Sequence, residues 1–386
     1  MKKIIKRSNI DINLACYFTM VLLGLYLAGY QNAVDSITKE YSISSAIMGA
    51  IIALHFIGSI TSPVVFGEIS DRKGTKIVTL TAFVFLIIGL LAVSLIKNIY
   101  ILALGIFLIG CGFSVIEGTL STVLSNNNPG HTVKVINMSQ MFFCIGAVLS
   151  PIFTLFIMKR FGSWKYVFII LTFLFFFMAV IFFRFDLDKS RNKQTKNIEC
   201  ENKIHSFVLL KQKSFILLCL AMFIYVGVEE GIAFWMTTFF GHTYNSTLWG
   251  SYALSAYWAG MVLGRFFAAL LPEKGITFLK IGTILTCFSI LLVLLTENKV
   301  LGFVSFALVG LGFSVTWPMI VSITSEKFHN FRGTAIGIMM SLGALGGTVL
   351  PFLIGIFDNF GKIRIAFWAM PFLAIIILIS ILHTEK

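Results

Sequence analysis

The chain has 386 residues, of which 58% are hydrophobic and only 12% are charged. Soluble domains are about 45–50% apolar and about 25% charged, so this composition excludes a soluble globular protein. The formal net charge of +13 would suggest nucleic-acid binding in a soluble protein, but in this chain its distribution is explained by orientation in a membrane.

Twelve apolar segments follow one another from Ile12 to Leu382, separated mostly by short polar breaks. A bilayer core about 30 Å thick requires about 20 apolar residues in a crossing helix. We therefore expect an all-α membrane protein with twelve transmembrane helices. The predicted spans are residues 13–36, 45–66, 77–96, 100–125, 135–158, 164–184, 214–240, 248–271, 276–296, 299–325, 332–356 and 364–382.

The basic residues gather on one side of the predicted spans. If the N-terminus is cytoplasmic, the inside segments hold 22 of the 30 Lys and Arg residues, which is the excess that the positive-inside rule expects. We therefore predict a multi-pass protein of the cell inner (cytoplasmic) membrane with both termini in the cytoplasm. No nucleic-acid partner is needed to explain the charge.

The loop between the second and third spans carries a family motif. It reads GEISDRKGTK over residues 67–76 and resembles the signature loop of the major facilitator superfamily, Gly-x-x-x-Asp-Arg-x-Gly-Arg-Arg, with Thr75 in place of the first closing basic residue. The resemblance implies a fold of two pseudo-symmetric six-helix bundles. It also implies a conformational latch, because Asp71 can meet a cationic side chain and the positive end of a facing helix. The implied latch residues are Gly67, Asp71, Arg72, Gly74 and Lys76.

The fourth and tenth spans are related in sequence. Residues 110–125 and 310–325 are identical at six of sixteen positions, at an offset of 200. Parallel repeats of six helices are typical of secondary transporters, in which two halves move about a site near the bilayer midplane. We therefore predict an N-terminal six-helix bundle over residues 1–184, a cytoplasmic linker loop over 185–213 and a C-terminal six-helix bundle over 214–386.

Span four contains one acid, Glu117. It stands about nine residues from the inner end of the span, roughly 13 Å at about 1.5 Å per residue. A charge at that depth costs at least about 2.5–3.5 kcal/mol by insertion scales, so acids in spans usually face the bundle interior and have a function. Glu117 is therefore a candidate for proton coupling and substrate binding. A structural glutamate that is hydrogen-bonded between helices is the alternative.

Span seven contains two neighbouring acids, Glu229 and Glu230. At most one of them faces a central cavity squarely, because successive helical residues point about 100° apart. The stretch from Tyr225 to Trp235 resembles span seven of the fucose permease and related sugar–proton symporters, a group that also has a glutamate in span four, at Glu117. The resemblance implies proton coupling by Glu117 and Glu229, with Glu230 as a further binding candidate. Trp235 would then be a stacking platform for a sugar ring, or else an interfacial belt tryptophan.

Span one contains a polar pair, Gln31 and Asn32. The pair follows Gly29 much as Glu229 follows its own glycine, so we take it as the counterpart of the acidic pair and as a substrate-binding candidate. Asp35 lies one turn further along the helix. It is either a substitute acid or an ordinary carboxylate at the end of a helix.

Three weaker candidates complete the set. His55 lies mid-span and could bind substrate or relay protons, with a packing histidine as the alternative. Trp317 aligns with Glu117 in the repeat and is followed by Pro318, which predicts a kinked aromatic wall that binds substrate opposite the acid. Arg265, near the inner end of span eight, is expected to cap the helix or to snorkel.

These patterns predict a secondary transporter of a small polar solute, with a sugar as the expected substrate, moved by proton-coupled alternating access. We expect a monomer in the lipid bilayer whose partners are the solute and protons. Drug or metabolite efflux by proton antiport is the alternative, although Ile106 stands where such antiporters usually have Arg, and Ser150 precedes Pro151. A membrane sensor or scaffold is a further alternative. No enzyme motif, phosphate-binding loop or metal-ligand spacing occurs, so neither an enzyme, a cofactor nor a metal is expected.

Overall fold

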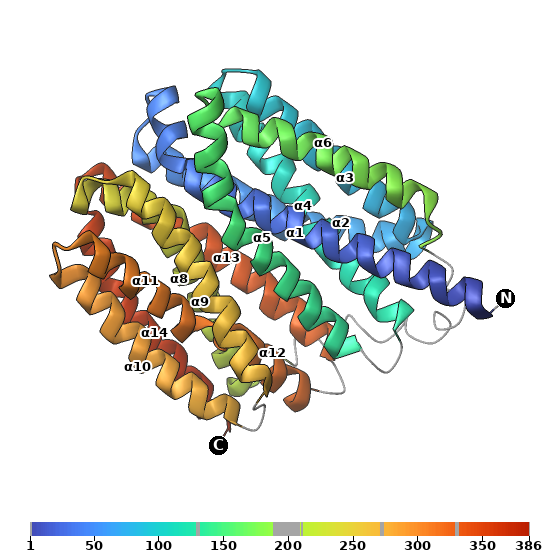
Figure 1. Cartoon of the computed structure of the whole chain (residues 1–386). Coiled ribbons are helices and arrows are strands. Elements are labelled where there is room, and N and C mark those ends of the chain that lie inside the picture. Colours follow the sequence, from blue (N-terminus) through green and yellow to red (C-terminus); the bar gives the residue numbers. More distant parts are fainter. Residues whose placement is uncertain are drawn as a thin grey trace. The chain divides into compact units, whose positions relative to one another are not determined.

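The fold is described from a computed structural model, which covers residues 2–128, 132–187, 209, 211–270, 274–328 and 332–385. Within these residues the regular structure is helical and contains no strand (Figure 1). The helices are α1 (Lys2–Tyr41), α2 (Ser45–Lys73), α3 (Thr75–Leu95), α4 (Ile99–Asn127), α5 (Thr132–Phe161), α6 (Lys165–Arg184), α8 (Lys213–Tyr244), α9 (Thr247–Leu270), α10 (Gly275–Leu295), α11 (Lys299–Phe313), α12 (Thr316–Lys327), α13 (Arg332–Asn359) and α14 (Ile363–Glu385).

The membrane-spanning character predicted from composition is confirmed. In the described part of the chain, eleven helical segments are long and apolar enough to cross a membrane, and α11 and α12 together form one of them. The remaining predicted span, the eighth, is α9. Its 24 residues extend about 36 Å at 1.5 Å per residue, but Ser251, Ser255 and Tyr257 make it more polar. Those three side chains are buried, so the polar face of α9 is turned away from lipid.

The described chain divides into two compact units. The first contains Met1–Ala33 and Leu54–Thr195, and the second contains Val34–Ala53 and Lys196–Lys386. The end of α1 and the beginning of α2 are thus grouped with the C-terminal helices. The bundles at residues 1–184 and 214–386 therefore stay a prediction, and most of the linker at 185–213 lies outside the described residues.

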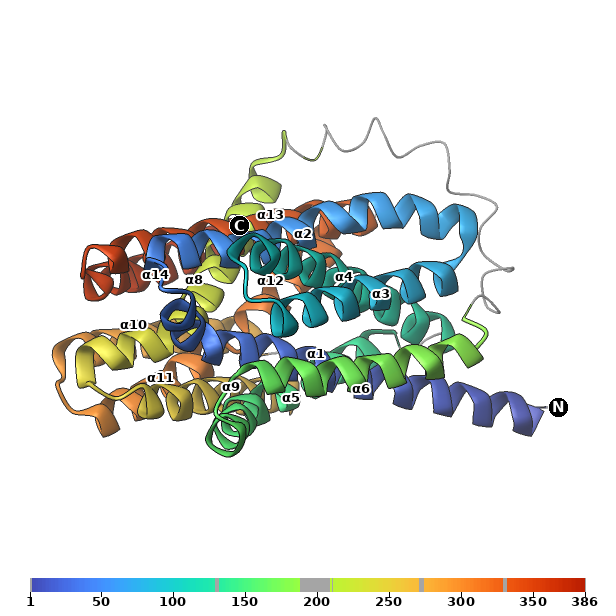
Figure 2. The ribbon, with the colours of Figure 1, turned by 90° about the horizontal axis from the view of Figure 1, so that it is seen from above.

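Each unit has its own packing order. In the first unit α3 packs against α4 and α6, and α4 also contacts α5. In the second unit α8 packs against α13, α14 and α9, and α10 packs against α11 and α14. The neighbours α3 and α6, and likewise α10 and α11, are seen side by side in both views (Figures 1 and 2).

Glycines at matched positions bring helices into close contact in both units. A Cβ atom on Gly110 would lie 2.0 Å from the carbonyl oxygen of His55, and one on Gly310 would lie 1.9 Å from that of Tyr257. No real side chain fits at such distances, so glycine is required at both positions. The repeat seen in the sequence is therefore a repeat of helix contacts, α4 on α2 and α11 on α9.

The helix ends repeat in the same way. Asn98 is the residue just before α4, and its Oδ1 accepts hydrogen bonds from the backbone N–H groups of Tyr100 and Ile101 at 2.9 and 3.3 Å. Asn298 precedes α11 in the same way, and its Oδ1 accepts from the N–H groups of Val300 and Leu301 at the same two distances. Such side chains satisfy N–H groups that a helix leaves open at its first turn. At the other end, Gly162 and Gly361 follow α5 and α13 with φ of 75° and 69°, a conformation that glycine adopts without strain.

One predicted span is interrupted. α11 ends at Phe313 and α12 begins at Thr316, so the kink expected at Pro318 is a break in the helix. Proline has no N–H, and its ring clashes with the carbonyl four residues earlier, which here belongs to Ser314. The matching residue in the first half is Gly118, and α4 is continuous there.

Candidate functional site

In the first unit, His55 lies in an aromatic cluster. Its Nδ1 atom is 3.4 Å from the hydroxyl of Tyr26, and both side chains are buried. The rings of Phe56, Phe113 and Tyr30 lie 5.3, 5.4 and 6.4 Å from the imidazole, measured between centroids. This environment agrees with a packing histidine that has a polar contact to Tyr26, and a binding or relay role stays a prediction.

Glu117 has a hydrogen-bond partner that the sequence analysis missed. Gln140 on α5 donates from Nε2 to Glu117 Oε1 on α4 at 3.0 Å. Glu117 is half-buried, so this carboxyl is held between two helices of one unit. The signal in the sequence was one of two amides, Asn137 and Gln140, in a mostly apolar fifth span, and it became informative only when the register of α5 against α4 was known.

The pairing of Gln31 and Asn32 with the two acids of span seven is wrong in register. Gly146 meets Val21 in the first unit, and Gly346 meets Phe223 in the second. The two glycines, on α5 and α13, are 200 residues apart in the chain, but the residues that they meet, on α1 and α8, are 202 residues apart. Gln31 therefore corresponds to Ala233, and the acids have no polar counterpart on α1.

The buried amides of α1 keep their place among the binding candidates. Gln31 is 0% and Asn32 is 5% exposed. The Oδ1 atom of Asn32 is buried and has no hydrogen-bond partner among the described residues. A buried carbonyl oxygen in that state costs free energy unless a ligand or water reaches it.

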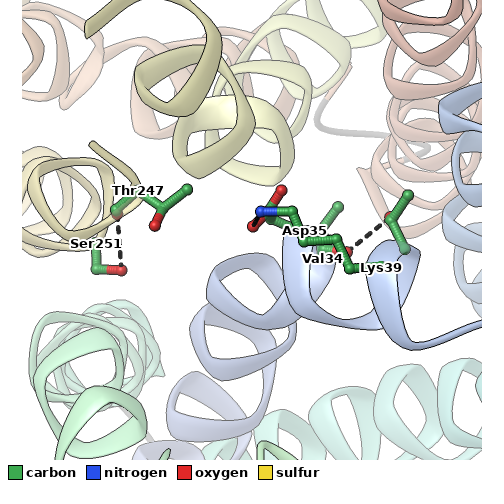
Figure 3. Close-up of polar contacts among 6 residues, drawn as sticks. Val34, Asp35, Lys39, Thr247 and Ser251 are labelled. Carbon is green, nitrogen blue, oxygen red and sulfur yellow. Dashed lines mark hydrogen bonds and ion pairs between the residues drawn. The ribbon is translucent and has the colours of Figure 1, made fainter. Parts of the chain in front are cut away.

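Asp35 lies near the C-terminal end of α1 and pairs with a residue of its own helix. Lys39 Nζ is 2.7 Å from Asp35 Oδ2, four residues along, and the Lys39 side chain is largely exposed. Figure 3 shows this pair, with Thr247 and Ser251 on the first turn of α9 in the same view. The arrangement is that of a carboxylate at a helix end.

In the second unit, Glu229 is tied to a tyrosine of the same helix. The hydroxyl of Tyr225 donates to Glu229 Oε1 at 2.8 Å, one turn apart on α8. Glu229 and Glu230 are 8% and 7% exposed, so both acids are withdrawn from the surface of the unit.

Arg265 contacts the end of a neighbouring helix. Its Nε atom donates to the carbonyl oxygen of Ser314, the residue that follows α11, at 3.4 Å. The side chain therefore turns toward the break between α11 and α12. This contact is a cap on the C-terminal end of α11, as basic side chains near helix ends can make, and snorkelling stays a prediction.

The two tryptophans differ in burial. Trp235 is 1% exposed, and its Nε1–H donates to the carbonyl oxygen of Pro351 on α13 at 2.8 Å. Its ring is held between two helices rather than in an interfacial belt, and its role as a stacking platform stays a prediction. Trp317 is half-buried in the first turn of α12.

The predicted latch is described only in part. The side chains of Asp71 and Arg72, and the surroundings of Gly67, lie outside the described residues. Gly74 connects α2 and α3 with φ of 99°, a value that favours glycine. Lys76 Nζ lies 5.3 Å from the ring centroid of Phe183. The latch itself stays a prediction.

Fold and side chains together define a class of protein. The chain is a multi-pass helical membrane protein built from two repeats. The first unit holds the half-buried Glu117, with Gln140 as hydrogen-bond donor, and the second unit buries Glu229 and Glu230, with Tyr225 as donor to Glu229. Among the described residues, no group of three or more His, Cys, Asp or Glu could hold a metal ion.

Comparison with known proteins gives the family. Residues 14–351 match the model of the Major Facilitator Superfamily. The chain is 21% identical over 362 residues to the glucose/mannose transporter GlcP of Bacillus subtilis, covering 87% of this chain and 88% of that protein. It is 23% identical over 355 residues to the gentisate transporter of Corynebacterium glutamicum, covering 88% and 79%. The crystal structure of the fucose:proton symporter FucP of E. coli matches with a TM-score of 0.67 at 15% identity, covering 96% and 98%.

The chain belongs to the Major Facilitator Superfamily, a family of transporters. The family prediction made from residues 67–76 and the repeat is confirmed by a match that spans most of the chain. The likeness to the fucose:proton symporter, at low identity, shows the shared fold.

Proposed function

We propose that this chain is a secondary active transporter that moves a small polar solute, with a sugar as the expected substrate, by proton-coupled alternating access. The observation that carries the proposal is that each compact unit places a carboxyl inside its helices and gives it a neutral donor, Gln140 for Glu117 and Tyr225 for Glu229. Acids at membrane depth are costly and usually functional.

The chemistry of these carboxyls fits proton coupling. An ionised carboxylate accepts hydrogen bonds, whereas a protonated one also donates. Glu117 and Glu229 would be protonated while the site faces outward and would bind substrate in that form. Release of the proton to the inside would then return the empty carrier. A neutral donor such as the Gln140 amide accommodates both forms of Glu117, because it does not fix the charge.

Two sets of observations support a sugar as the solute. The first unit has buried amides at Gln31 and Asn32 and a polar contact between His55 and Tyr26, groups that can hydrogen-bond hydroxyls. A relative, GlcP, is named as a glucose/mannose transporter. The gentisate transporter is the reason for including an aromatic acid in the test panel.

The proposed setting is the cytoplasmic membrane, with both termini in the cytoplasm and a monomer as the working unit. The solute, protons and the lipid bilayer are the partners. Nothing in this function requires nucleic acid, a cofactor or a catalytic group.

Uptake by proteoliposomes tests the proposal. Radiolabelled glucose, mannose, fucose, xylose and gentisate are offered with and without an inside-alkaline pH gradient. We expect at least one sugar to accumulate above its external concentration only when the gradient is present, and a protonophore to abolish that accumulation. Glu117→Gln should lose gradient-driven uptake yet keep exchange of the same sugar. Ser121→Ala, one turn along α4, is the matched control and should behave as wild type.

Two outcomes would overturn the proposal. Sugar uptake that is equal with and without the pH gradient would show a facilitator rather than a proton-coupled carrier. Gradient-driven expulsion of cationic drugs, with no sugar uptake, would restore the antiport alternative despite the buried apolar side chain of Ile106.

A further inference from the structure

An ion pair that the proposed transport cycle does not use joins the ends of α8 and α13. His242 Nδ1 lies 2.9 Å from Asp358 Oδ1. His242 belongs to the last turn of α8, and Asp358 belongs to the last turn of α13. The two helices pack against each other within the second unit, so the pair fastens one helix end to another inside a single unit.

The two partners differ in exposure. The side chain of His242 is 54% exposed, whereas that of Asp358 is 1% exposed. With 32 residues, α8 extends about 48 Å at about 1.5 Å per residue, while a bilayer core is about 30 Å thick, so the helix is long enough for its last turn to reach water. With the N-terminus in the cytoplasm, as proposed, both helices end on the outer side. Protons from outside therefore reach the imidazole, while the carboxylate is shielded.

Asp358 depends on His242 for compensation of its charge. Both carboxylate oxygens are buried, and apart from this ion pair neither has a hydrogen-bond partner among the described residues. The carboxylate also lies at the C-terminal end of a helix, where the free carbonyl groups disfavour a negative charge. A buried charge that loses its partner strongly destabilises the fold. Because histidine changes its charge between about pH 5 and 8, this compensation is sensitive to pH.

The titratable groups that neighbouring elements present near the histidine are bound elsewhere or exposed. On α1, Asp35 and Lys39 face it but pair with each other at 2.7 Å. Arg364 on α14 and Tyr244 on α8 each donate to a backbone carbonyl oxygen at the end of α10, at 2.6 and 3.0 Å. Lys362 is exposed in the turn after α13, and the first turn of α9 has no ionisable side chain.

The pair lies next to a helix contact that outward opening must break. Three residues before Asp358, a Cβ atom on Gly355 would lie 2.6 Å from the carbonyl oxygen of Ser45 at the start of α2. A Cβ atom on Gly49, one turn further along α2, would lie 3.2 Å from the backbone of α13. The start of α2 thus packs on α13 inside the second unit, although the rest of α2 is grouped with the first unit. Movement of the two units in alternating access therefore has to separate α2 from α13.

We propose that His242 and Asp358 form a pH-sensitive latch that keeps the outer end of the second unit closed in acid and releases it as the outside becomes alkaline. The protonated imidazole holds the end of α13 against α8 and so preserves the surface on which α2 packs. Once the imidazole loses its proton, the carboxylate is buried without a partner, and the end of α13 moves to bring it to water. The latch regulates the carrier and does not drive it. This inference rests on the proposed function, because it concerns opening during alternating access.

Labelling of a cysteine by a membrane-impermeant maleimide tests the latch and requires no substrate. Met48 is buried in the first turn of α2, so Met48→Cys should be labelled from outside only when that end opens. Lys97→Cys, in the exposed loop between α3 and α4, reports the pH dependence of the reagent alone, and wild type without an added cysteine gives the background. The rate for Met48→Cys relative to Lys97→Cys should rise several-fold as the external pH goes from about 5.5 to about 8.

Three variants, each combined with the two cysteines, assign this rise to the ion pair. His242→Gln cannot become cationic and should give the high relative rate at every pH, whereas His242→Arg keeps the cation and should give the low one. Asp358→Asn removes the buried charge, so its relative rate should not change with pH. His383→Gln, which removes an exposed histidine from α14 of the same unit, is the matched control and should keep the wild-type rise.

Thermal unfolding in detergent is a second measurement that does not depend on labelling. The ion pair stabilises the fold while His242 is protonated, so the unfolding temperature of wild type should fall between about pH 5.5 and about pH 8. The fall should be absent in Asp358→Asn. The double variant His242→Gln/Asp358→Asn should be more stable than His242→Gln, because it leaves no buried charge without a partner.

The outcomes separate the latch from the proposed function. A relative labelling rate that does not change with external pH in wild type would overturn the latch, and so would a rise that persists in His242→Gln. A double variant no more stable than His242→Gln would show that Asp358 does not depend on His242. Absence of gradient-driven uptake, together with the expected labelling, would overturn the proposed function and leave the pH-sensitive opening established.

Discussion

α4 and the α11–α12 pair come from the same repeated segment, yet only α4 is a continuous helix. The glycines that bring these helices against α2 and α9 are kept at matched positions, as Gly110 and Gly310 show. At the centre of the repeat, however, Glu117 and Gly118 align with Trp317 and Pro318. The scaffold is therefore repeated while the chemistry is not.

The difference extends to the partners of the acids. In the first unit the acid is on α4 and its donor, Gln140, is a neutral amide on α5. In the second unit the acid is on α8, and its donor is the hydroxyl of Tyr225 on the same helix. Two differently supported acids on one scaffold predict two different responses to pH, so the halves should not be interchangeable.

The largest expected effect is on gradient-driven uptake. Glu117→Gln and Glu229→Gln should each reduce uptake to the level of empty liposomes, because each acid is expected to carry a proton. Gln140→Ala and Tyr225→Phe remove only a donor and should reduce uptake without abolishing it. Initial rates of sugar uptake under an imposed pH gradient check this order. Full uptake by either glutamine variant would show that coupling depends on one unit alone.

The next effect is on stability, and it tests the repeated scaffold. Gly110→Ala and Gly310→Ala would each place a Cβ atom about 2 Å from a backbone oxygen, and overpacking of this kind costs about 1–3 kcal/mol. Thermal unfolding in detergent, followed by tryptophan fluorescence, should show both variants destabilised alike. A Cβ on Gly118 meets nothing within 4 Å, so Gly118→Ala is the matched control and should not be destabilised. Tolerance of alanine at one of the two sites would show that the halves pack differently.

A comparable but more local effect is expected at Trp235. Trp235→Phe keeps an aromatic ring but loses the hydrogen bond to the Pro351 carbonyl, and the net contribution of one such bond is about 0.5–1.5 kcal/mol. We expect a lower unfolding temperature and an unchanged KM for sugar. A KM increase with unchanged stability would instead support a stacking platform.

The smallest effect is expected at the helix starts. Asn98→Ala and Asn298→Ala remove the same two hydrogen bonds from α4 and α11, and loss of such a cap costs about 0.5–2 kcal/mol. The two losses should be equal within error, and aspartate at either position should restore stability. Unequal losses would mean that the ends of the two helices are supported differently.

The fold class followed from the sequence because it depends on composition and period. Apolar runs of spanning length fixed the helices, and the offset of 200 between residues 110–125 and 310–325 identified the repeat. The break at Ser314 was signalled by Pro318. These are local features, and one chain is enough to read them.

The site was less predictable because it depends on how helices register against one another. The contacts of α1 with α5 show that Gln31 corresponds to Ala233 and not to Glu229. The alignment of the two helices from their glycines was therefore wrong by four residues. Gln140 was missed, and the partner of Arg265 was not identified, because Glu117 and Ser314 are on other elements. Side-chain direction within a bundle is a tertiary property.

The most direct test of proton-coupled transport is to measure the proton flux that accompanies sugar entry. Proteoliposomes in a lightly buffered medium, with potassium and valinomycin to clamp the membrane potential, receive the transported sugar while external pH is recorded. A symporter should carry protons inward with the sugar, so the medium should become alkaline for wild type and stay unchanged for Glu117→Gln. Sugar entry without any pH change, or with acidification of the medium, would contradict the account.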